Sequence, residues 1–347
     1  IFVSAFLYIL LFFSSPFIAK LYKTPQLITL QRVFFILIIF NSLTVVQSAK
    51  LQAKVDFKTI AIISSITSLI SGLIGIIAAY KGLGPWALVL QSLTRTFLVV
   101  VLYWVNGKWF PKTGFSWESF KKLFGFGSKL LVSGLLATTL TNIENLFIGK
   151  IYNSESLGYY SRAQQFPELT SGTLSGVLNN ATFPLLSSLQ NDQEGLKDTF
   201  KRLIRITSMF VYPSMVGLAI LSKPIVLLLL GDKWFFSSEL LFWLALSYIF
   251  TPLSILNMNI LNAIGRSDLF LKADLCKVPI IIFTMILTFP ISIKAVVIGK
   301  LVCAFIYFYI NTFMIGRMYS FGAFKQVACS WKYILSTLFM SFCVKFI

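Results

Sequence analysis

The sequence predicts an all-α membrane protein whose helices cross the bilayer many times. Hydrophobic residues make up 57% of the 347-residue chain and charged residues only 12%, whereas soluble domains contain about 45–50% and 25%. Apolar runs recur along the chain at about 20 residues each, the length that crosses a hydrocarbon core of ~30 Å as a helix. Lys and Arg in cytoplasmic loops account for the net charge of +18, so no nucleic-acid partner is expected.

Turn signals such as KGLGP at 81–85 and GDKW at 231–234 divide the chain into about eleven predicted spans. The spans lie near 1–19, 26–48, 59–80, 84–105, 123–151, 155–189, 203–230, 238–263, 270–293, 294–316 and 331–347. Alternate loops differ in charge, since one set carries 17 Lys and Arg and the other only 7. The positive-inside rule therefore places the first set in the cytoplasm, and the first span runs outward.

The chain resembles itself at an offset near 208 residues. SSPFIAKLY (14–22) aligns with SKPIVLLLL (222–230), and WALVLQSL (86–93) aligns with KAVVIGKL (294–301). The offset encloses six spans, so the two copies share one orientation, which predicts two parallel-repeat six-helix bundles that form a V-shaped transporter. The second copy begins near Phe120, so the first would begin about 88 residues before Ile1.

The sequence is accordingly interpreted as a fragment that lacks two spans at its start. The predicted domains are the remainder of the N-terminal bundle at 1–105, a cytoplasmic linker at 106–122, and a C-terminal six-helix bundle at 123–317. A loop and the start of additional C-terminal spans follow at 318–347.

Charges inside the predicted spans are the first candidates for a site. Six basic residues fall there: Arg32, Arg95, Lys129, Arg162, Lys300 and Lys345. A charge at mid-membrane costs roughly 2.5–3.5 kcal/mol on insertion scales, so such residues usually face a cavity or a partner. Two readings stay open, a wet cationic cavity that binds substrate and structural neutralisation of these cations by Glu144 or Glu168.

Helical phase adds polar residues and helix breakers to this site. Thr138, Thr141, Asn142 and Asn145 form one stripe, and Arg162, Gln165, Leu169, Gly172, Gly176, Asn179 and Asn180 share another face. The two glycines suit either close helix packing or a smooth lining beside a bulky substrate. Pro167 and Pro184 are hinge candidates in the same span.

Other function classes lack their usual signals. The sequence contains no His, no phosphate-cradling glycine motif and no paired-carboxylate site, which disfavours an enzyme such as a membrane-embedded glycan polymerase or ligase. The cysteines (Cys276, Cys303, Cys329 and Cys343) are far apart, so no disulfide framework, metal site or cofactor is expected. A transporter driven by an ion gradient or by the substrate's own gradient fits better, and a multidrug or small-cation exporter remains an alternative.

The segment LGYYSRAQQFPELTSGTLSGVLNNATFPLLSSLQND (157–192) closely resembles a hallmark of the bacterial polysaccharide flippases. These are the lipopolysaccharide and exopolysaccharide exporters of the multidrug/oligosaccharidyl-lipid/polysaccharide superfamily. FGFGSKLLVSGLL (124–136), VYPSMVGLAILSKPIVLLLLGDKW (211–234) and NAIGRSDLFLKADL (262–275) resemble the same family. Many relatives carry a basic residue where Asn180 stands and proline where Thr170 stands, which argues against phosphate contact at position 180.

The resemblance implies fourteen spans, of which this chain holds about eleven. It also implies export of an undecaprenyl-diphosphate-linked oligosaccharide (an O-antigen, capsule or exopolysaccharide unit) across the bacterial cytoplasmic membrane by alternating access. Expected partners are this substrate, membrane lipids, and a polysaccharide polymerase with its assembly proteins. The expected substrate-binding residues are Arg162, Arg95, Lys300, Arg32, Lys129, Gln165, Asn142 and Asn145, with Glu168 and Glu144 as ion-pair or coupling residues. Flipping of lipid II on the same fold is the other alternative.

Overall fold

The computed structural model describes residues 2–54, 56–107, 117–190 and 192–345, and within these ranges the chain is helical apart from short turns. It divides into two compact units, unit 1 (Ile1–Leu135) and unit 2 (Leu136–Ile347). The domain bounds predicted from the repeat are not tested by this division and stay a prediction.

Unit 1 holds five helices and the first half of a sixth. They are α1 (Phe2–Leu21), α2 (Leu27–Phe34), α3 (Ile36–Ala53), α4 (Phe57–Tyr80), α5 (Pro85–Gly107) and the start of α6 (Trp117–Ile151). Unit 2 holds the rest of α6, then α7 (Ser154–Ser188), α8 (Gln193–Ile220), α9 (Ser222–Leu230), a 3₁₀ turn η1 (Asp232–Trp234), α10 (Phe235–Tyr248), α11 (Phe250–Ala263), α12 (Ser267–Thr288), α13 (Ile293–Tyr319), α14 (Ala323–Cys329) and α15 (Trp331–Lys345).

These helices follow the eleven predicted spans in order and position, and the chain is an all-α, multi-pass membrane protein. Seven helical stretches among the described residues are long and apolar enough to cross a membrane, or eight if α14 and α15, bent by 61°, form one span. Crossing by the remaining helices stays a prediction, as does the fourteen-span total.

Several predicted spans are broken rather than straight. The span near 26–48 is divided at Phe35 into α2 and α3, and the span near 238–263 is divided at Ile249 into α10 and α11. Pro252 lies in the first turn of α11, where a missing backbone N–H costs nothing, so it marks a new helix start. The polar residues 193–202, placed in a loop by the sequence, form the first turns of α8.

In unit 1 the closest packing joins α4 and α5. Gly75 of α4 allows the Gln91 side chain of α5 to pack closely, because a Cβ added at Gly75 would lie only 3.1 Å from Gln91 side-chain atoms. The α4 helix begins at Asp56, whose carboxylate accepts hydrogen bonds from the Thr59 backbone N–H at 3.1 Å and from its hydroxyl at 2.7 Å. This is the side-chain cap that satisfies an otherwise unpaired helix N–H.

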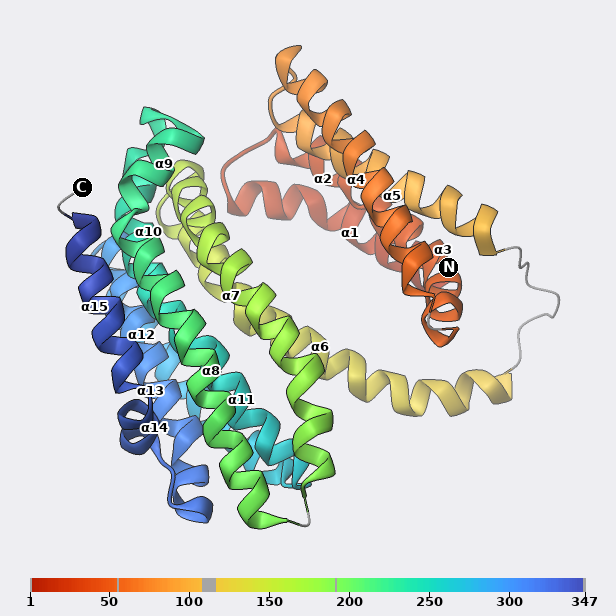
Figure 1. Cartoon of the computed structure of the whole chain (residues 1–347). Coiled ribbons are helices and arrows are strands. Elements are labelled where there is room, and N and C mark those ends of the chain that lie inside the picture. The colour runs from red at the N-terminus through yellow and green to blue at the C-terminus, as the bar shows by residue number, and fades with distance from the viewer. Residues whose placement is uncertain (1, 55, 108–116, 191, 346–347) are drawn as a thin grey trace. The chain divides into compact units, whose positions relative to one another are not determined.

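In unit 2, α7 packs against α10 and α11, and α13 packs against α10, α11 and α12. Figure 1 shows α7, α8 and α10 of this unit running side by side. One face of α7, with Tyr160 and Ala163 fully buried, joins Leu240, Leu241 and Leu244 of α10 in an apolar core. This core fixes the rotation of α7 about its axis. The rotation determines which side chains of α7 lie on its two other faces.

Candidate functional site

A polar pocket of about 500 Å³ opens in unit 2 among α6, α7 and α10 to α13. Its polar and titratable lining is Asn142, Glu144, Asn145, Ser161, Gln164, Glu168, Ser247, Tyr248, Thr251, Lys300, Cys303 and Tyr307. Five of the predicted site residues therefore come together in it, from α6, α7 and α13: Asn142, Asn145, Glu144, Glu168 and Lys300.

The side chains of Lys300 and Glu144, which both line this pocket, form an ion pair. The Lys300 ammonium donates to Glu144 Oε2 at 2.7 Å and to the Tyr160 hydroxyl oxygen at 2.8 Å. The Tyr160 hydroxyl in turn donates to the same Glu144 oxygen at 2.7 Å. The side chains of Lys300 and Glu144 are only 21% and 13% exposed, so water screens their attraction poorly. Glu144 thus balances the charge of Lys300.

The pocket as a whole carries one excess negative charge. Glu168 lines it, is exposed, and forms no salt bridge with a described residue. Gln164 lies one helical turn before it and donates to the Tyr248 hydroxyl oxygen at 3.3 Å. Amides and hydroxyls of this kind both donate and accept hydrogen bonds, as sugar hydroxyls do, whereas the unpaired carboxylate repels a phosphate.

Arg162 lies outside the pocket, on a neighbouring face of α7. Its guanidinium donates to Gln165 Oε1 at 3.0 Å and lies 6.0 Å from the centre of the Trp234 ring. The guanidinium forms no salt bridge to a carboxylate among the described residues, Glu168 included. The charge of Arg162 is therefore not balanced by a described carboxylate, unlike that of Lys300.

The rest of this face is open in unit 2. Arg162, Gln165, Leu169, Gly172 and Gly176 are all exposed, and we call this set the open face of α7. No atom lies within 4 Å of a Cβ built on either glycine, so no helix of unit 2 packs closely there. Asn179 and Asn180, predicted for the same face, have side chains outside the described set.

The other predicted cations are held differently. Arg32 of α2 donates to the Ser15 hydroxyl at 3.1 Å and stacks 4.1 Å from the Phe12 ring, which fixes it against α1. Arg95 of α5 is exposed on unit 1. The side chain of Lys129 lies outside the described residues, so its predicted role is untested.

The two hinge candidates lie within one continuous helix, since α7 runs from Ser154 to Ser188. Pro167 is buried on the face that packs against α10 and α11. The side chain of Pro184 is not among those described. Whether either proline bends the helix during transport stays a prediction.

Sequence reasoning missed Gln164 and Tyr307, which line the pocket, and Tyr160, which hydrogen-bonds to the ion pair from the apolar core. Helical phase held the signal for some of them, because Lys300, Cys303 and Tyr307 share one face of α13 at i, i+3 and i+7. No sequence signal identified Tyr160, which packs in the apolar core and reaches Lys300 across 140 residues.

Comparison with known proteins is consistent with this architecture. Residues 1–239 match the model of a family described as polysaccharide biosynthesis protein. The teichuronic acid biosynthesis protein TuaB of Bacillus subtilis (strain 168) is 26% identical over 265 residues, which cover 76% of this chain and 55% of TuaB. The succinoglycan biosynthesis transport protein ExoT of Rhizobium meliloti (strain 1021) is 24% identical, covering 70% of this chain and 49% of ExoT.

The lipopolysaccharide biosynthesis protein WzxC of Escherichia coli (strain K12) is 23% identical, covering 54% of this chain and 38% of WzxC. The chain thus spans about half the length of the curated relatives it matches. Among solved structures, the lipid II flippase MurJ in an inward closed conformation matches 99% of this chain and 75% of its own. The TM-score is 0.78 at 18% identity, a likeness of fold.

Proposed function

The chain belongs to the polysaccharide biosynthesis protein family, and on that premise we propose that the whole protein is a flippase for lipid-linked oligosaccharide. Its cargo is an undecaprenyl-diphosphate-linked unit of an O-antigen, capsule or exopolysaccharide. The protein moves the sugar from the cytoplasmic to the outer leaflet of the bacterial inner membrane by alternating access. It acts as a transporter and not as an enzyme.

One observation carries the proposal: α7, inside an otherwise apolar bundle, has a polar open face with an unneutralised guanidinium. A cation in contact with lipid tails costs roughly 2.5–3.5 kcal/mol on insertion scales, so such a face belongs against water or a polar cargo. Guanidinium matches phosphate geometry through paired N–H donors. Arg162 is therefore the candidate that binds the diphosphate.

The pocket beside this face suits the sugar. Asn142, Asn145 and Gln164 offer amide donors and acceptors, and Tyr248 offers a hydroxyl. Gly172 and Gly176 leave room for a bulky glycan along α7. The polyprenyl tail stays in the lipid, where its burial needs no protein partner.

We assign separate roles to the two carboxylates. Glu144 is occupied by Lys300 and Tyr160 and holds α6, α7 and α13 together. Glu168 faces the pocket without a counter-ion, so protonation there changes the charge beside the cargo. Glu168 is therefore the candidate for coupling to a proton gradient, and Arg95 and Arg32 remain secondary candidates for cargo binding.

Complementation of three bacterial strains tests the class of substrate. The full-length protein is expressed in strains that lack their own polysaccharide exporter, their lipid II flippase, or their main cationic-drug exporter. Restored surface polysaccharide in the first strain alone is the expected result. Rescue of growth in the second strain alone would identify a lipid II flippase, to which the fold is similar. Drug resistance in the third alone would identify a multidrug exporter.

A further inference from the structure

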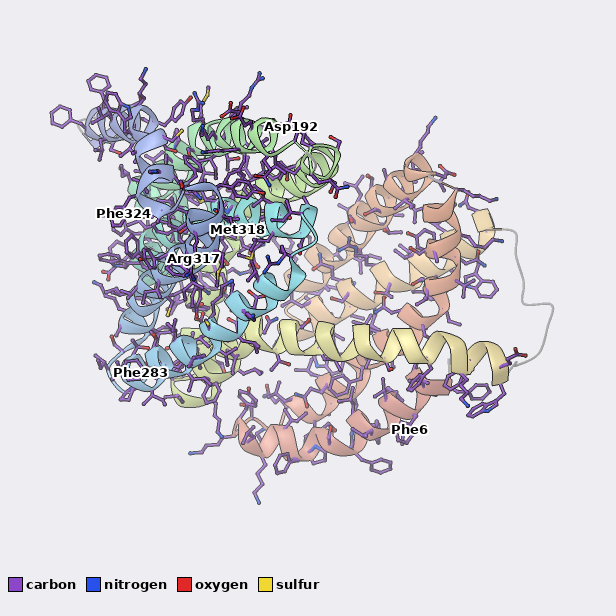
Figure 2. All side chains as sticks on the ribbon, turned by 90° about the horizontal axis from the view of Figure 1, so that it is seen from below. Phe6, Asp192, Phe283, Arg317, Met318 and Phe324 are labelled. Carbon is purple, nitrogen blue, oxygen red and sulfur yellow. The ribbon has the colours of Figure 1, made fainter. Side chains whose placement is uncertain are left out.

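A second, strongly basic pocket lies in unit 2 and shares no lining residue with the candidate site. It measures about 490 Å³ and lies between α8 and α15. Its lining is Asp198, Lys201, Arg202, Arg205, Ile206 and Tyr333. Figure 2 looks at this end of unit 2, with Asp192 labelled where α8 begins.

The charge of this pocket is unbalanced. Lys201 is paired with Asp198 at 2.8 Å, one helical turn away. Arg202 and Arg205 are exposed, and neither forms a salt bridge with a described residue. The guanidinium groups of Arg202 and Arg205 therefore have no salt-bridge partner among the described residues, although Asp198 attracts Arg205, and their planar donors suit the oxygens of a phosphate.

The helix face that carries these arginines becomes apolar toward the middle of the protein. Ile206, Met209 and Phe210 follow at helical spacing and are 44%, 50% and 52% exposed. The opposite face of α8 is buried in the core through Leu196, Phe200 and Ile204. Cations followed by exposed apolar side chains match the order of headgroup and acyl chain in a lipid leaflet.

The second wall of the pocket repeats this order. On α15, Trp331 is exposed and Tyr333 lines the pocket, and exposed Leu335, Leu338 and Phe339 follow. Trp and Tyr concentrate at the level of lipid headgroups. A hydrogen bond of 2.8 Å between the Ser208 and Ser330 hydroxyls joins α8 to the start of α15 beside the pocket, which holds the two walls at a fixed separation.

We propose that this pocket binds the phosphate of an anionic phospholipid, with the acyl chains lying along α8 and α15. Arg202 and Arg205 bind the phosphate, Tyr333 lies at headgroup level, and Ile206 and Met209 contact the upper acyl chain. The charge distribution of the loops places this site on the cytoplasmic side. The site is independent of transport of the glycan, so its failure would leave the proposed function standing.

Native mass spectrometry of the purified protein measures this binding directly. The probes are dioleoyl-phosphatidylglycerol and dioleoyl-phosphatidylcholine, which share acyl chains but differ in net charge. Each cytoplasmic arginine near a membrane favours anionic lipid roughly fivefold. With two arginines, the wild-type protein should therefore retain phosphatidylglycerol roughly thirtyfold more strongly than phosphatidylcholine, and Arg202→Gln/Arg205→Gln should abolish most of that preference.

Two further variants test whether the lipid preference depends on the pocket itself, rather than on the total charge of the protein or on its folding. Lys58→Gln/Lys272→Gln removes the same charge from exposed positions outside the pocket and should keep the preference. Arg202→Lys/Arg205→Lys keeps the charge and should retain most of it. Equal binding of the two lipids by the wild-type protein, or an equal loss in the Lys58/Lys272 variant, would overturn the proposal. So would displacement of phosphatidylglycerol by millimolar inorganic phosphate, which would identify a site for free phosphate.

Discussion

At the scale of single residues, the decisive distinction is between cations that are paired and cations that are free. Lys300 and Arg162 look equivalent in the sequence, since each is a basic residue within an apolar run. The structure separates them, because Glu144 balances the charge of Lys300, while among the described residues Arg162 hydrogen-bonds to the amide of Gln165 and forms no salt bridge. The partner of Lys300 lies 156 residues away, so only the packing of α6 against α13 could reveal it.

Breaking this ion pair should destabilise unit 2. Lys300→Met leaves the Glu144 carboxylate largely buried without its counter-charge, at a cost of about 3 kcal/mol, the low end for buried pairs because the pocket admits water. A cost of this size corresponds to a fall of roughly 5–10 °C in the apparent melting temperature. Thermal unfolding of the detergent-solubilised protein measures it.

The control is a double variant, Lys300→Gln/Glu144→Gln, which removes both charges and keeps hydrogen-bonding groups near Tyr160. It should recover more than half of the loss seen in Lys300→Met. A Lys300→Met protein as stable as the wild type would show that the pair contributes nothing to the fold.

Glu168 should respond differently from Glu144. Glu168→Gln removes the unpaired carboxylate of the pocket, so transport should lose its dependence on the proton gradient while the melting temperature stays unchanged. Measuring transport with and without a protonophore checks this, and Glu144→Gln, which alters the paired carboxylate, is the matched variant. Full sensitivity to the protonophore in Glu168→Gln would exclude Glu168 as the coupling group.

At the scale of elements, α7 has one face in the apolar core, one that lines the polar pocket and one that is open in unit 2. Its glycines differ from the packing glycine of α13. A Cβ on Gly299 would lie 2.8 Å from methyl groups of both Thr284 and Thr288, whereas Gly172 and Gly176 face open space. Gly299→Ala should therefore destabilise by about 1–3 kcal/mol through overpacking. Gly172→Ala should be neutral or stabilising, because Ala exceeds Gly in helix propensity by about 1 kcal/mol.

The larger change Gly172→Leu/Gly176→Leu tests the open face itself. It should leave the melting temperature near that of the wild type and lower glycan transport, since two isobutyl groups fill the proposed path. Normal transport by this variant would place the cargo elsewhere.

The start of α4 offers a test of pH dependence. Hydrogen bonds from the Thr59 side chain and backbone, aided by nearby Lys54 and Lys58, hold the pKa of Asp56 below its ordinary value of 3.8. A lowered pKa means that the stabilisation is complete above the unfolded-state value and is lost as pH falls through the folded-state value. The protection factor of the Thr59 amide, which is its intrinsic exchange rate at each pH divided by the observed rate, should therefore fall in acid in the wild type. In Asp56→Ala the protection factor should already be low at neutral pH, and a wild-type protection factor there would contradict the cap.

The sequence predicted the positions of the helical spans better than the breaks within them. Apolar periodicity located the spans. Two pairs of helix ends also agree with the proposed offset of 208 residues: α5 and α13 begin at Pro85 and Ile293, and α4 and α12 end at Tyr80 and Thr288. The repeat itself remains a prediction. Periodicity could not locate the breaks at Phe35 and Ile249, because apolar residues flank both and the break depends on tertiary packing.

At the scale of the whole molecule, the charge distribution predicts a single orientation in the membrane. Basic residues concentrate at one set of loops, 17 against 7. In a variant without native cysteines, Lys58→Cys should react with a membrane-impermeant maleimide only from the cytoplasmic side. Lys233→Cys should react only from the opposite side. Labelling of both positions from one side would contradict the predicted order of spans.

The most direct test of the proposed function is the initial rate at which the reconstituted full-length protein flips undecaprenyl-diphosphate-linked oligosaccharide in proteoliposomes. Arg162→Ala should lower that rate at least tenfold, on the order of the 1.5–3 kcal/mol of a charged hydrogen bond. Arg162→Lys should retain part of it, and Arg317→Ala, an exposed arginine at the end of α13, should leave it unchanged. A wild-type rate in Arg162→Ala would contradict the assignment of the diphosphate to the open face of α7.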